Sequence, residues 1–325
     1  MQAHSASPAA ATPSPAQPGE TVLRTHDVTR QYGERVAVNH LTIEVRRGEI
    51  VGFLGPNGAG KTTTIRMILG LIAPTSGWVE LFGRDLTTGR AHLLPRIGAL
   101  VETPALYLHL SGRDNLRAVA AVLGGVPRQR IDAVLEQVGL RERQKDRVRT
   151  YSLGMRQRLG VAIALLQQPD LLILDEPANG LDPAGVVEMR DLLHRLADEG
   201  KAVFLSSHLL GEVQQICSRV LLLNLGKLVA DNTVAELTRG QGEYAVQLEH
   251  AAEALALLQQ QPWGKTARLD GNGTLLTPAP QESGRELYAF LAQAGFPPES
   301  LAPATQNLED VFFSLIDTRK GEQDQ

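Results

Sequence analysis

Cysteine is almost absent from this chain. Only Cys217 occurs among the 325 residues, and its sequence setting is apolar. A lone cysteine of this kind is usually a small buried core residue, so we expect a structural role in a reducing cytosol rather than a nucleophile.

Long hydrophobic runs are missing as well. No apolar stretch reaches the roughly 18 to 20 residues that would span a bilayer. No basic start followed by an apolar segment marks a signal peptide. We therefore expect a cytosolic protein, which would serve a membrane process only by docking on another chain.

A strong positive charge is also lacking. The formal net charge is -4, so no general binding to nucleic acid is expected. With 43% hydrophobic and 21% charged residues, the composition is that of a globular protein, and the length allows two folded units.

Composition and pattern divide the chain into three parts. Residues 1–20 are rich in Ala, Pro and Ser and are expected to be disordered. Residues 21–240 alternate strand-like and helix-like segments, with a mainly helical stretch at about 100–165, which predicts a mostly parallel sheet covered by helices. Residues 241–325 read as an accessory α+β domain, whose element order resembles a split β-α-β, ferredoxin-like unit.

A glycine-rich motif follows the buried strand "IVGFL" and opens a helix. The segment "GPNGAGKTTT" fits G-x-x-x-x-G-K-[ST] with Gly55, Gly60, Lys61 and Thr62. The glycines let backbone N–H groups surround phosphates, while the Lys61 ammonium neutralises the β- and γ-phosphates. The Thr62 hydroxyl is placed to bind Mg²⁺, and Thr63 adds a contact on the α-phosphate side.

Two acids and a histidine end neighbouring strands. In "LLILDEP", we assign Asp175 to Mg²⁺, through water, and Glu176 to the general base that activates an attacking water. In "KAVFLSSH", His208 is placed to contact a γ-phosphate and to hold Glu176 and water in line. A helix cap or salt bridge is the structural alternative for the acids, and a packing role is the alternative for the histidine.

The segment "YSLGMRQRLG" predicts a helix that begins after Ser152. A helix N-terminus with a serine cap and Gly154 is a suitable anion site.

With this segment the chain resembles the ATPase of ATP-binding cassette (ABC) transporters over about residues 21–240. The motifs occur in the family's order: Tyr32 where the family stacks adenine, the glycine loop, "YSLGM" at the signature, "LLILDEP", "NGLD" and "SSH".

The resemblance implies a fold and a site. The fold is α/β: a P-loop NTPase with a RecA-like parallel sheet, an antiparallel β subdomain and a helical subdomain, followed here by the small accessory domain. ATP and Mg²⁺ are the implied cofactors. Nucleotide contacts are carried over to Tyr32, Gly55, Pro56, Asn57, Gly58, Ala59, Gly60, Lys61, Thr62, Thr63, Glu102 and Asp175, and metal contacts to Thr62, Asp175 and Glu102.

The family also implies a dimer of two identical chains around two ATP molecules. The signature residues Ser152, Leu153, Gly154 and Met155 would bind the γ-phosphate of ATP held by the other copy. Asp182 of "NGLD" would cross the interface, and hydrolysis, with Glu176 and His208 as catalytic residues, would release the two copies.

The chain departs from the usual family pattern at two places. Leu153 and Met155 replace a glycine and a glutamine of the signature, and Glu102 stands where a glutamine usually contacts metal and water. Both variants are similar to bacterial exporter ATPases of the bacitracin-resistance and lantibiotic-immunity branch. Glu102 facing solvent is the alternative. The ending "TQNLEDVFFSLI" resembles drug exporters of the daunorubicin-resistance type.

These resemblances imply a bacterial exporter subunit that hydrolyses ATP to move a drug, antibiotic or peptide through separate membrane subunits. It would sit at the cytoplasmic face of the cell membrane, docked on the permease by a groove near 102–112, where "TPALYLHLS" is apolar. Core packing is the competing interpretation of those side chains. The alternative function is a soluble cassette ATPase that acts on ribosomes or DNA.

Overall fold

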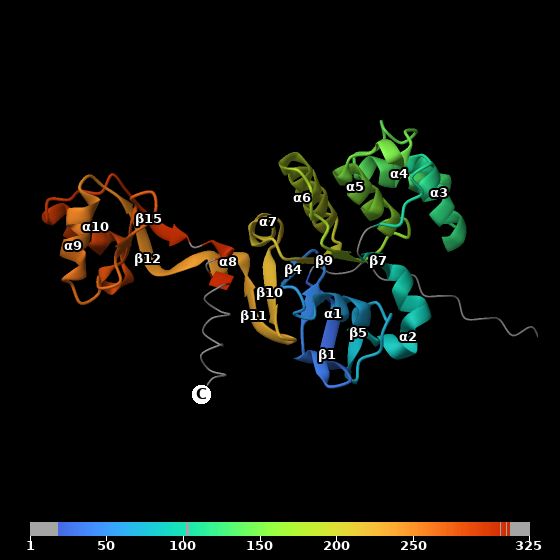
Figure 1. The fold of residues 1–325 in the computed structure, drawn as a ribbon, viewed down its shortest axis with the longest axis horizontal. Coiled ribbons are helices and arrows are strands. Elements are labelled where there is room, and N and C mark those ends of the chain that lie inside the picture. Colours follow the sequence, from blue (N-terminus) through green and yellow to red (C-terminus); the bar gives the residue numbers. More distant parts are fainter. Residues whose placement is uncertain (1–18, 102–103, 306, 310, 313–325) are drawn as a thin grey trace, which may run out of the picture. The chain divides into compact units, whose positions relative to one another are not determined.

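The computed structural model describes residues 19–101, 104–305, 307–309 and 311–312 (Figure 1). The predicted disorder of 1–20 thus lies almost wholly outside the described residues. The chain divides into two compact units, 1–230 and 231–325, so the division falls before the expected boundary near residue 240.

The centre of the first unit is a six-stranded sheet in the order β11-β10-β4-β9-β8-β7. Neighbouring strands are parallel from β10 through β4, β9 and β8 to β7. All side chains of β4, β8 and β9 are buried, as expected for unbroken apolar runs in a sheet with both faces covered. The bounds are β4 (Ile50–Leu54), β7 (Ile97–Leu100), β8 (Leu171–Asp175), β9 (Ala202–Ser207), β10 (Arg219–Asn224) and β11 (Lys227–Thr233).

A second, antiparallel sheet packs in the same unit. Its order is β2-β1-β5-β6, with β3 paired to β1. The two sheets share one hydrophobic core, in which the rings of Phe53 and Phe204 lie 5.2 Å apart and helix α1 (Lys61–Ile68) contributes Ile65 and Ile68. The strands are β1 (Thr21–Tyr32), β2 (Arg35–Leu41), β3 (Glu44–Arg46), β5 (Ser76–Leu81) and β6 (Arg84–Asp85).

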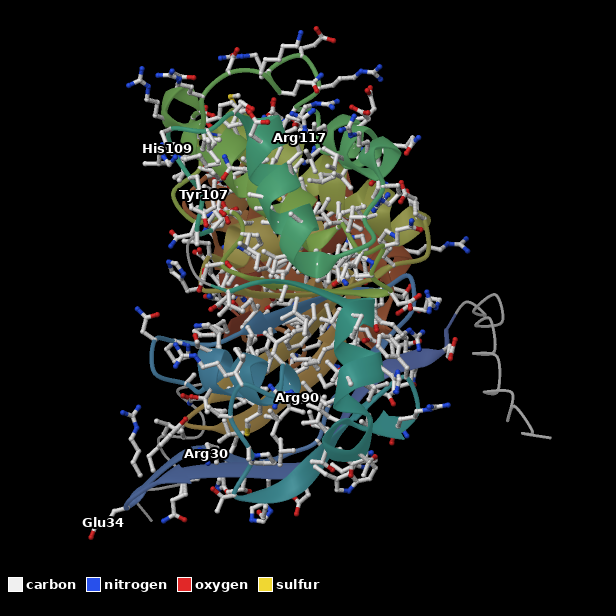
Figure 2. The ribbon with its side chains drawn as sticks, turned by 90° about the vertical axis from the view of Figure 1, so that its right-hand side faces the viewer. Arg30, Glu34, Arg90, Tyr107, His109 and Arg117 are labelled. Carbon is white, nitrogen blue, oxygen red and sulfur yellow. The ribbon has the colours of Figure 1, made fainter. Side chains whose placement is uncertain are left out.

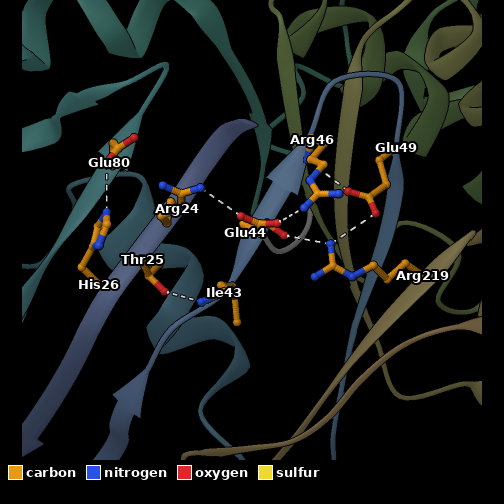
Figure 3. A network of polar contacts seen from close by, with 9 residues as sticks. All are labelled: Arg24, Thr25, His26, Ile43, Glu44, Arg46, Glu49, Glu80 and Arg219. Carbon is orange, nitrogen blue, oxygen red and sulfur yellow. Dashed lines mark hydrogen bonds and ion pairs between the residues drawn. The ribbon is translucent and has the colours of Figure 1, made fainter. Parts of the chain in front are cut away.

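Polar contacts at the surface connect the two sheets (Figure 3). Glu44 of β3 accepts from Arg24 of β1 at 3.1 Å and pairs with Arg46. The hydrogen bond from Arg24 is the main reason that the pKa of Glu44 is lowered. Arg219 of β10 donates to the Glu44 carbonyl and to the Glu49 carboxylate, both at 3.3 Å. This network holds the antiparallel sheet against the parallel one at the end away from the glycine loop.

Three helices form the helical part of the first unit beyond edge strand β7 (Figure 1): α3 (Gly112–Leu123), α4 (Arg128–Gln137) and α5 (Leu153–Ala164). Ser111 caps α3 by accepting from the Asp114 N–H at 3.1 Å. Tyr151 is buried before α5, and its hydroxyl donates to the Arg143 carbonyl at 2.7 Å. The remaining helices are α2 (Leu86–Leu93), α6 (Pro183–Asp198) and α7 (Leu210–Ile216), with one-turn helices η1 (Leu94–Arg96) and η2 (Val148–Thr150).

The second unit contains a four-stranded antiparallel sheet in the order β13-β14-β12-β15. Its chain order, β12-α9-β13-β14-α10-β15, is that of the split β-α-β unit suggested by the sequence. Leu258 of α9 and Leu287 and Leu291 of α10 pack on Val246 and Leu275 of the sheet. The bounds are α8 (Val234–Thr238), β12 (Arg239–Gln247), α9 (Ala251–Gln259), β13 (Arg268–Leu269), β14 (Leu275–Pro278), η3 (Pro280–Glu282), α10 (Gly284–Gln293) and β15 (Ser300–Thr305).

The α/β fold class expected from the sequence is confirmed, including the parallel core sheet, the antiparallel sheet and the helical part. Within the described ranges, no helix is both long and apolar enough to cross a bilayer.

Candidate functional site

A cleft of about 740 Å³ opens beside the glycine-rich loop in the first unit. Four segments that are distant in sequence form its walls: the β1–β2 hairpin, the loop and first turn of α1, the end of β8, and the end of β9. Its lining residues are Tyr32, Arg35, Ala37, Pro56, Asn57, Gly58, Gly60, Lys61, Thr62, Thr63, Asp175, Glu176, Asn179 and His208.

The glycines of the loop are required by close backbone approaches. A Cβ on Gly55 would lie 2.3 Å from the Leu223 carbonyl oxygen, and one on Gly60 would lie 2.4 Å from that of Ala37. Gly60 also has φ 109°, which L side chains rarely adopt. The backbone therefore bends tightly into α1, whose first N–H groups lie at the cleft and favour an anion.

Lys61 is a buried cation of the cleft. Its side chain is only 7% exposed, and Nζ donates to the Gly55 carbonyl at 2.7 Å. Burial lowers the pKa of Lys61, while the negative charges of Glu176 and Asp175 act in the opposite direction. Nζ also lies 3.5 Å from the Pro56 carbonyl, a longer contact. An ammonium has three N–H donors, so at least one is left for the oxygens of a bound phosphate.

The two acids at the end of β8 have different surroundings. Asp175 is 7% exposed and accepts a hydrogen bond from the Ser206 hydroxyl of β9. Glu176 follows with φ 51°, and its N–H donates to the Ser206 carbonyl at 3.1 Å. This turn directs the Glu176 carboxylate to His208, where Oε2 lies 2.9 Å from Nδ1.

The signature residues lie outside the cleft of their own chain. The Ser152 hydroxyl caps α5 by accepting from the Met155 N–H at 3.2 Å. Leu153 is 39% exposed, and its side chain contacts Gly180, where an added Cβ would meet Leu153 Cδ2 at 3.2 Å. Asp182 caps α6 by accepting from the Gly185 N–H at 3.2 Å. These geometries present the start of α5 at the protein surface.

Most residues that the sequence predicts to contact nucleotide meet in the cleft, which three residues outside that prediction also line. Gly55 and Ala59 do not line it: the Gly55 carbonyl holds Lys61, and Ala59 is buried. Glu102 lies outside the described residues. The three residues outside that prediction are Arg35, Ala37 and Asn179. Asn179 stands in the quoted segment "NGLD", and Arg35 stands three residues after Tyr32, directly opposite it in the β1–β2 register.

The sheet topology, the glycine loop before α1 and the acids at the end of β8 define a P-loop ATPase domain. A family model described as "ABC transporter" matches residues 38–179. The bacitracin transport ATP-binding protein BcrA of Bacillus licheniformis is 42% identical over 298 residues, 91% of this chain and 97% of that protein. The chain belongs to the ATP-binding proteins of ABC transporters.

Other relatives agree with this assignment. The lantibiotic transport ATP-binding protein SrtF of Streptococcus pyogenes is 38% identical, covering 65% of this chain and 90% of that protein. A solved structure of an ATP binding subunit of an ABC transporter is 30% identical with a TM-score of 0.59, covering 67% of this chain and 92% of that one. The cbiO1 structure from Clostridium perfringens, at 24% identity and TM-score 0.62, covers 75% and 96% and supports the fold.

Membership of this family shows the general activity of the chain. The domain binds ATP, and ATP hydrolysis is a general property of the family. ATP-binding subunits of ABC transporters work with membrane permease subunits.

Proposed function

We propose that this protein is the ATP-hydrolysing subunit of a bacterial exporter, and that it works as a homodimer closed around two ATP molecules. The observation that carries the proposal is the convergence of Lys61, Asp175 and the Glu176–His208 pair on one cleft beside the glycine loop. Water is the proposed nucleophile, because ATP hydrolysis is the general activity of the family.

The phosphate end of ATP would lie over the glycine loop. The N–H groups at the start of α1 and the Lys61 ammonium would neutralise the phosphates. Thr62 and Asp175 supply a hydroxyl and a carboxylate in the same cleft, which are oxygen ligands of the type that Mg²⁺ prefers. When bound there, Mg²⁺ would neutralise charge on the β- and γ-phosphates. Glu102, the third predicted metal residue, remains a proposal from the sequence.

Glu176 and His208 would act on the attacking water. Glu176 follows Asp175 at the end of β8 and lines the cleft, so its carboxylate would face the γ-phosphate of a bound ATP. It would accept a proton from water, while His208 orients its carboxylate through the contact between Nδ1 and Oε2. This pair supplies the hydrolytic part of the proposal.

The second copy would complete each site. The N-terminus of α5 is exposed at Ser152 and Leu153, so it is free to approach an anion held by another chain. Ser152, Leu153, Gly154 and Met155 would close over the γ-phosphate in trans, and Asp182 would contact the same interface. ATP would thus join two copies, and its hydrolysis would separate them.

The permease would dock on the helical part. Tyr107 is 55% exposed and Leu108 49% exposed, and the Tyr107 ring lies edge-on to His109 with 6.1 Å between centroids (Figure 2). An exposed apolar pair in the proposed groove near 102–112 suits a short amphipathic helix. The subunit would then sit at the cytoplasmic face of the membrane. The names of BcrA and SrtF support a peptide antibiotic as the cargo.

Phosphate release by the purified protein tests the proposal. We expect slow, Mg²⁺-dependent ATP hydrolysis that Glu176→Gln lowers at least about 100-fold, a loss typical for a missing general base. The matched control Glu136→Gln removes an exposed carboxylate that pairs with Arg141 and should retain activity. Equal activity of the wild type and Glu176→Gln would reject the catalytic assignment, and co-purification with ribosomes instead of membranes would favour the soluble alternative.

A further inference from the structure

Tyr32 has one of its two ring faces already occupied. The guanidinium of Arg30 lies over the ring, with its central carbon 4.5 Å from the ring centroid. Arg30 is two residues earlier on β1, so both side chains lie on the same side of the strand. A planar cation stacked on one face of an aromatic ring leaves only the opposite face for another planar group.

A hydrogen bond to the backbone holds the Arg30 side chain in place. Its Nη1 donates to the Ala73 carbonyl at 2.9 Å, in the loop that follows α1. The same loop is tied to β1 by two further bonds, from the Thr75 N–H to the Thr29 carbonyl at 2.7 Å and from the Gln31 N–H to the Thr75 hydroxyl at 3.1 Å. Arg30 does not line the cleft, whereas Tyr32 does. Arg30 therefore covers the face of the Tyr32 ring that points away from the cleft, and the face toward the cleft is open. Figure 2 shows Arg30 on β1, toward the hairpin tip at Glu34.

Arg35 stands on the other side of the hairpin. It is opposite Tyr32 in the β1–β2 register and lines the cleft. Its Nη2 would lie 3.6 Å from a Cβ placed on Gly58, so the guanidinium reaches the phosphate loop. Among the residues that the structure describes, the Arg35 side chain has no hydrogen-bond or ion-pair partner. A guanidinium with all its donors free, beside a loop built for phosphate, matches an anionic oxygen of the ligand.

We propose that Arg30, Tyr32 and Arg35 form one recognition unit for the nucleotide, resting on the proposed function of the cleft. Arg35 is a direct contact to the phosphate chain of ATP, bonded to oxygens at the nucleoside end of the triphosphate. Arg30 is a positioning residue: it holds the Tyr32 ring so that its free face stacks on the base. Across the site, the Arg30 guanidinium comes first, then the Tyr32 ring, and then the base. Arg35 lies between the Tyr32 ring and the phosphate loop.

Ligands that carry only part of ATP separate the two roles. Arg35→Ala should raise the Kd for ATP about 5- to 20-fold and raise that for inorganic tripolyphosphate by a similar factor, since a charge-assisted contact is lost from both. Arg30→Ala should raise the Kd for ATP about 2- to 5-fold, as expected for an exposed cation–π contact, and leave tripolyphosphate binding unchanged. Arg30→Lys, which keeps a cation over the ring, should restore much of the ATP affinity.

Calorimetry on the full chain measures the Kd values for ATP and tripolyphosphate. Arg84→Ala is the control, because Arg84 is an exposed arginine of the same antiparallel sheet and lies outside the cleft. In ATP hydrolysis, both test variants should raise KM and leave kcat within about twofold, since neither residue touches the γ-phosphate. Unchanged tripolyphosphate affinity in Arg35→Ala would overturn its phosphate contact. Equal loss of ATP and tripolyphosphate binding in Arg30→Ala would overturn the ring-positioning role. Failure of the wild type to bind ATP would instead reject the proposed function.

Discussion

Glu176 Oε2 lies 2.9 Å from His208 Nδ1, although the two residues follow different strands of the parallel sheet. The contact depends on the pairing of β8 with β9, which sets Asp175 opposite Ser206. Glu176 then turns with φ 51° toward the end of β9. The sheet register, rather than any local motif, brings the proposed base to the histidine that we propose orients it.

His208→Ala should lower kcat for ATP hydrolysis by about 100-fold or more, because the Glu176 carboxylate loses the partner that orients it. KM should stay within about threefold, since the phosphate loop is untouched. The control is His194→Ala: His194 is exposed on α6, and its ring Nε2 lies 3.4 Å from the Gln215 carbonyl. Steady-state phosphate release measures both constants. A variant lacking His208 with full kcat would contradict the positioning role.

Lys61→Ala should weaken ATP binding about 10- to 100-fold, the range expected when a charged hydrogen-bond donor to phosphate is removed. Lys227→Ala, an exposed lysine at the start of β11, is the control and should bind as the wild type does. Calorimetric titration gives both affinities. The Gly55 carbonyl also loses its partner in Lys61→Ala, so thermal unfolding should accompany the titration to show that the domain is folded. Wild-type affinity in the folded variant would contradict the site.

Glu212→Gln should stabilise the protein at neutral pH. Burial raises the pKa of Glu212, the charge of Glu176 raises it further, and that of His208 acts against them. Oε2 of Glu212 is buried with no hydrogen-bond partner in the described part of the chain. A carboxyl whose pKa is raised by folding favours the folded state below its unfolded pKa of about 4.3, and that advantage is lost as pH rises through the folded value. The amide variant avoids this loss.

Thermal unfolding between pH 5 and pH 8 measures the effect. The Tm of Glu212→Gln should exceed that of the wild type by up to about 3 °C at pH 8, and the difference should shrink toward pH 5. Partial exposure of Glu212 keeps the gain small. Glu34→Gln, at the exposed tip of the β1–β2 hairpin, should show no such trend. A lower Tm for Glu212→Gln at pH 8 would mean that its carboxylate is stabilised by contacts in the folded protein.

The sequence predicted those parts of the site that lie within one continuous motif. The glycine loop, Lys61 and the Asp175–Glu176 pair follow directly from buried strands, so their positions relative to the sheet could be expected. The helix start at Ser152 was predicted from its capping residue, and the hydroxyl does cap α5. Such features depend on neighbours a few residues away.

The missed parts depend on pairing between distant segments. Arg35 belongs to the cleft because the β1–β2 register sets it opposite Tyr32, and a list of motifs does not include that register. Strands β5 to β7 and helix α2 were not predicted, since β5 is exposed over its first three residues and lacks the alternation of a half-buried strand. The role of Arg30 depends on the Ala73 carbonyl, which lies 43 residues away in sequence.

The mass of the Glu176→Gln protein with and without Mg–ATP tests the central claim most directly. Light scattering should show a single chain of about 35.1 kDa without nucleotide and twice that mass with saturating Mg–ATP, because the disabled base leaves ATP intact between two copies. Adding Ser152→Ala, which removes the hydroxyl at the start of α5, should weaken this ATP-dependent dimer. A protein that binds ATP at Lys61 yet keeps the mass of one chain, with the permease supplied as well, would contradict the account.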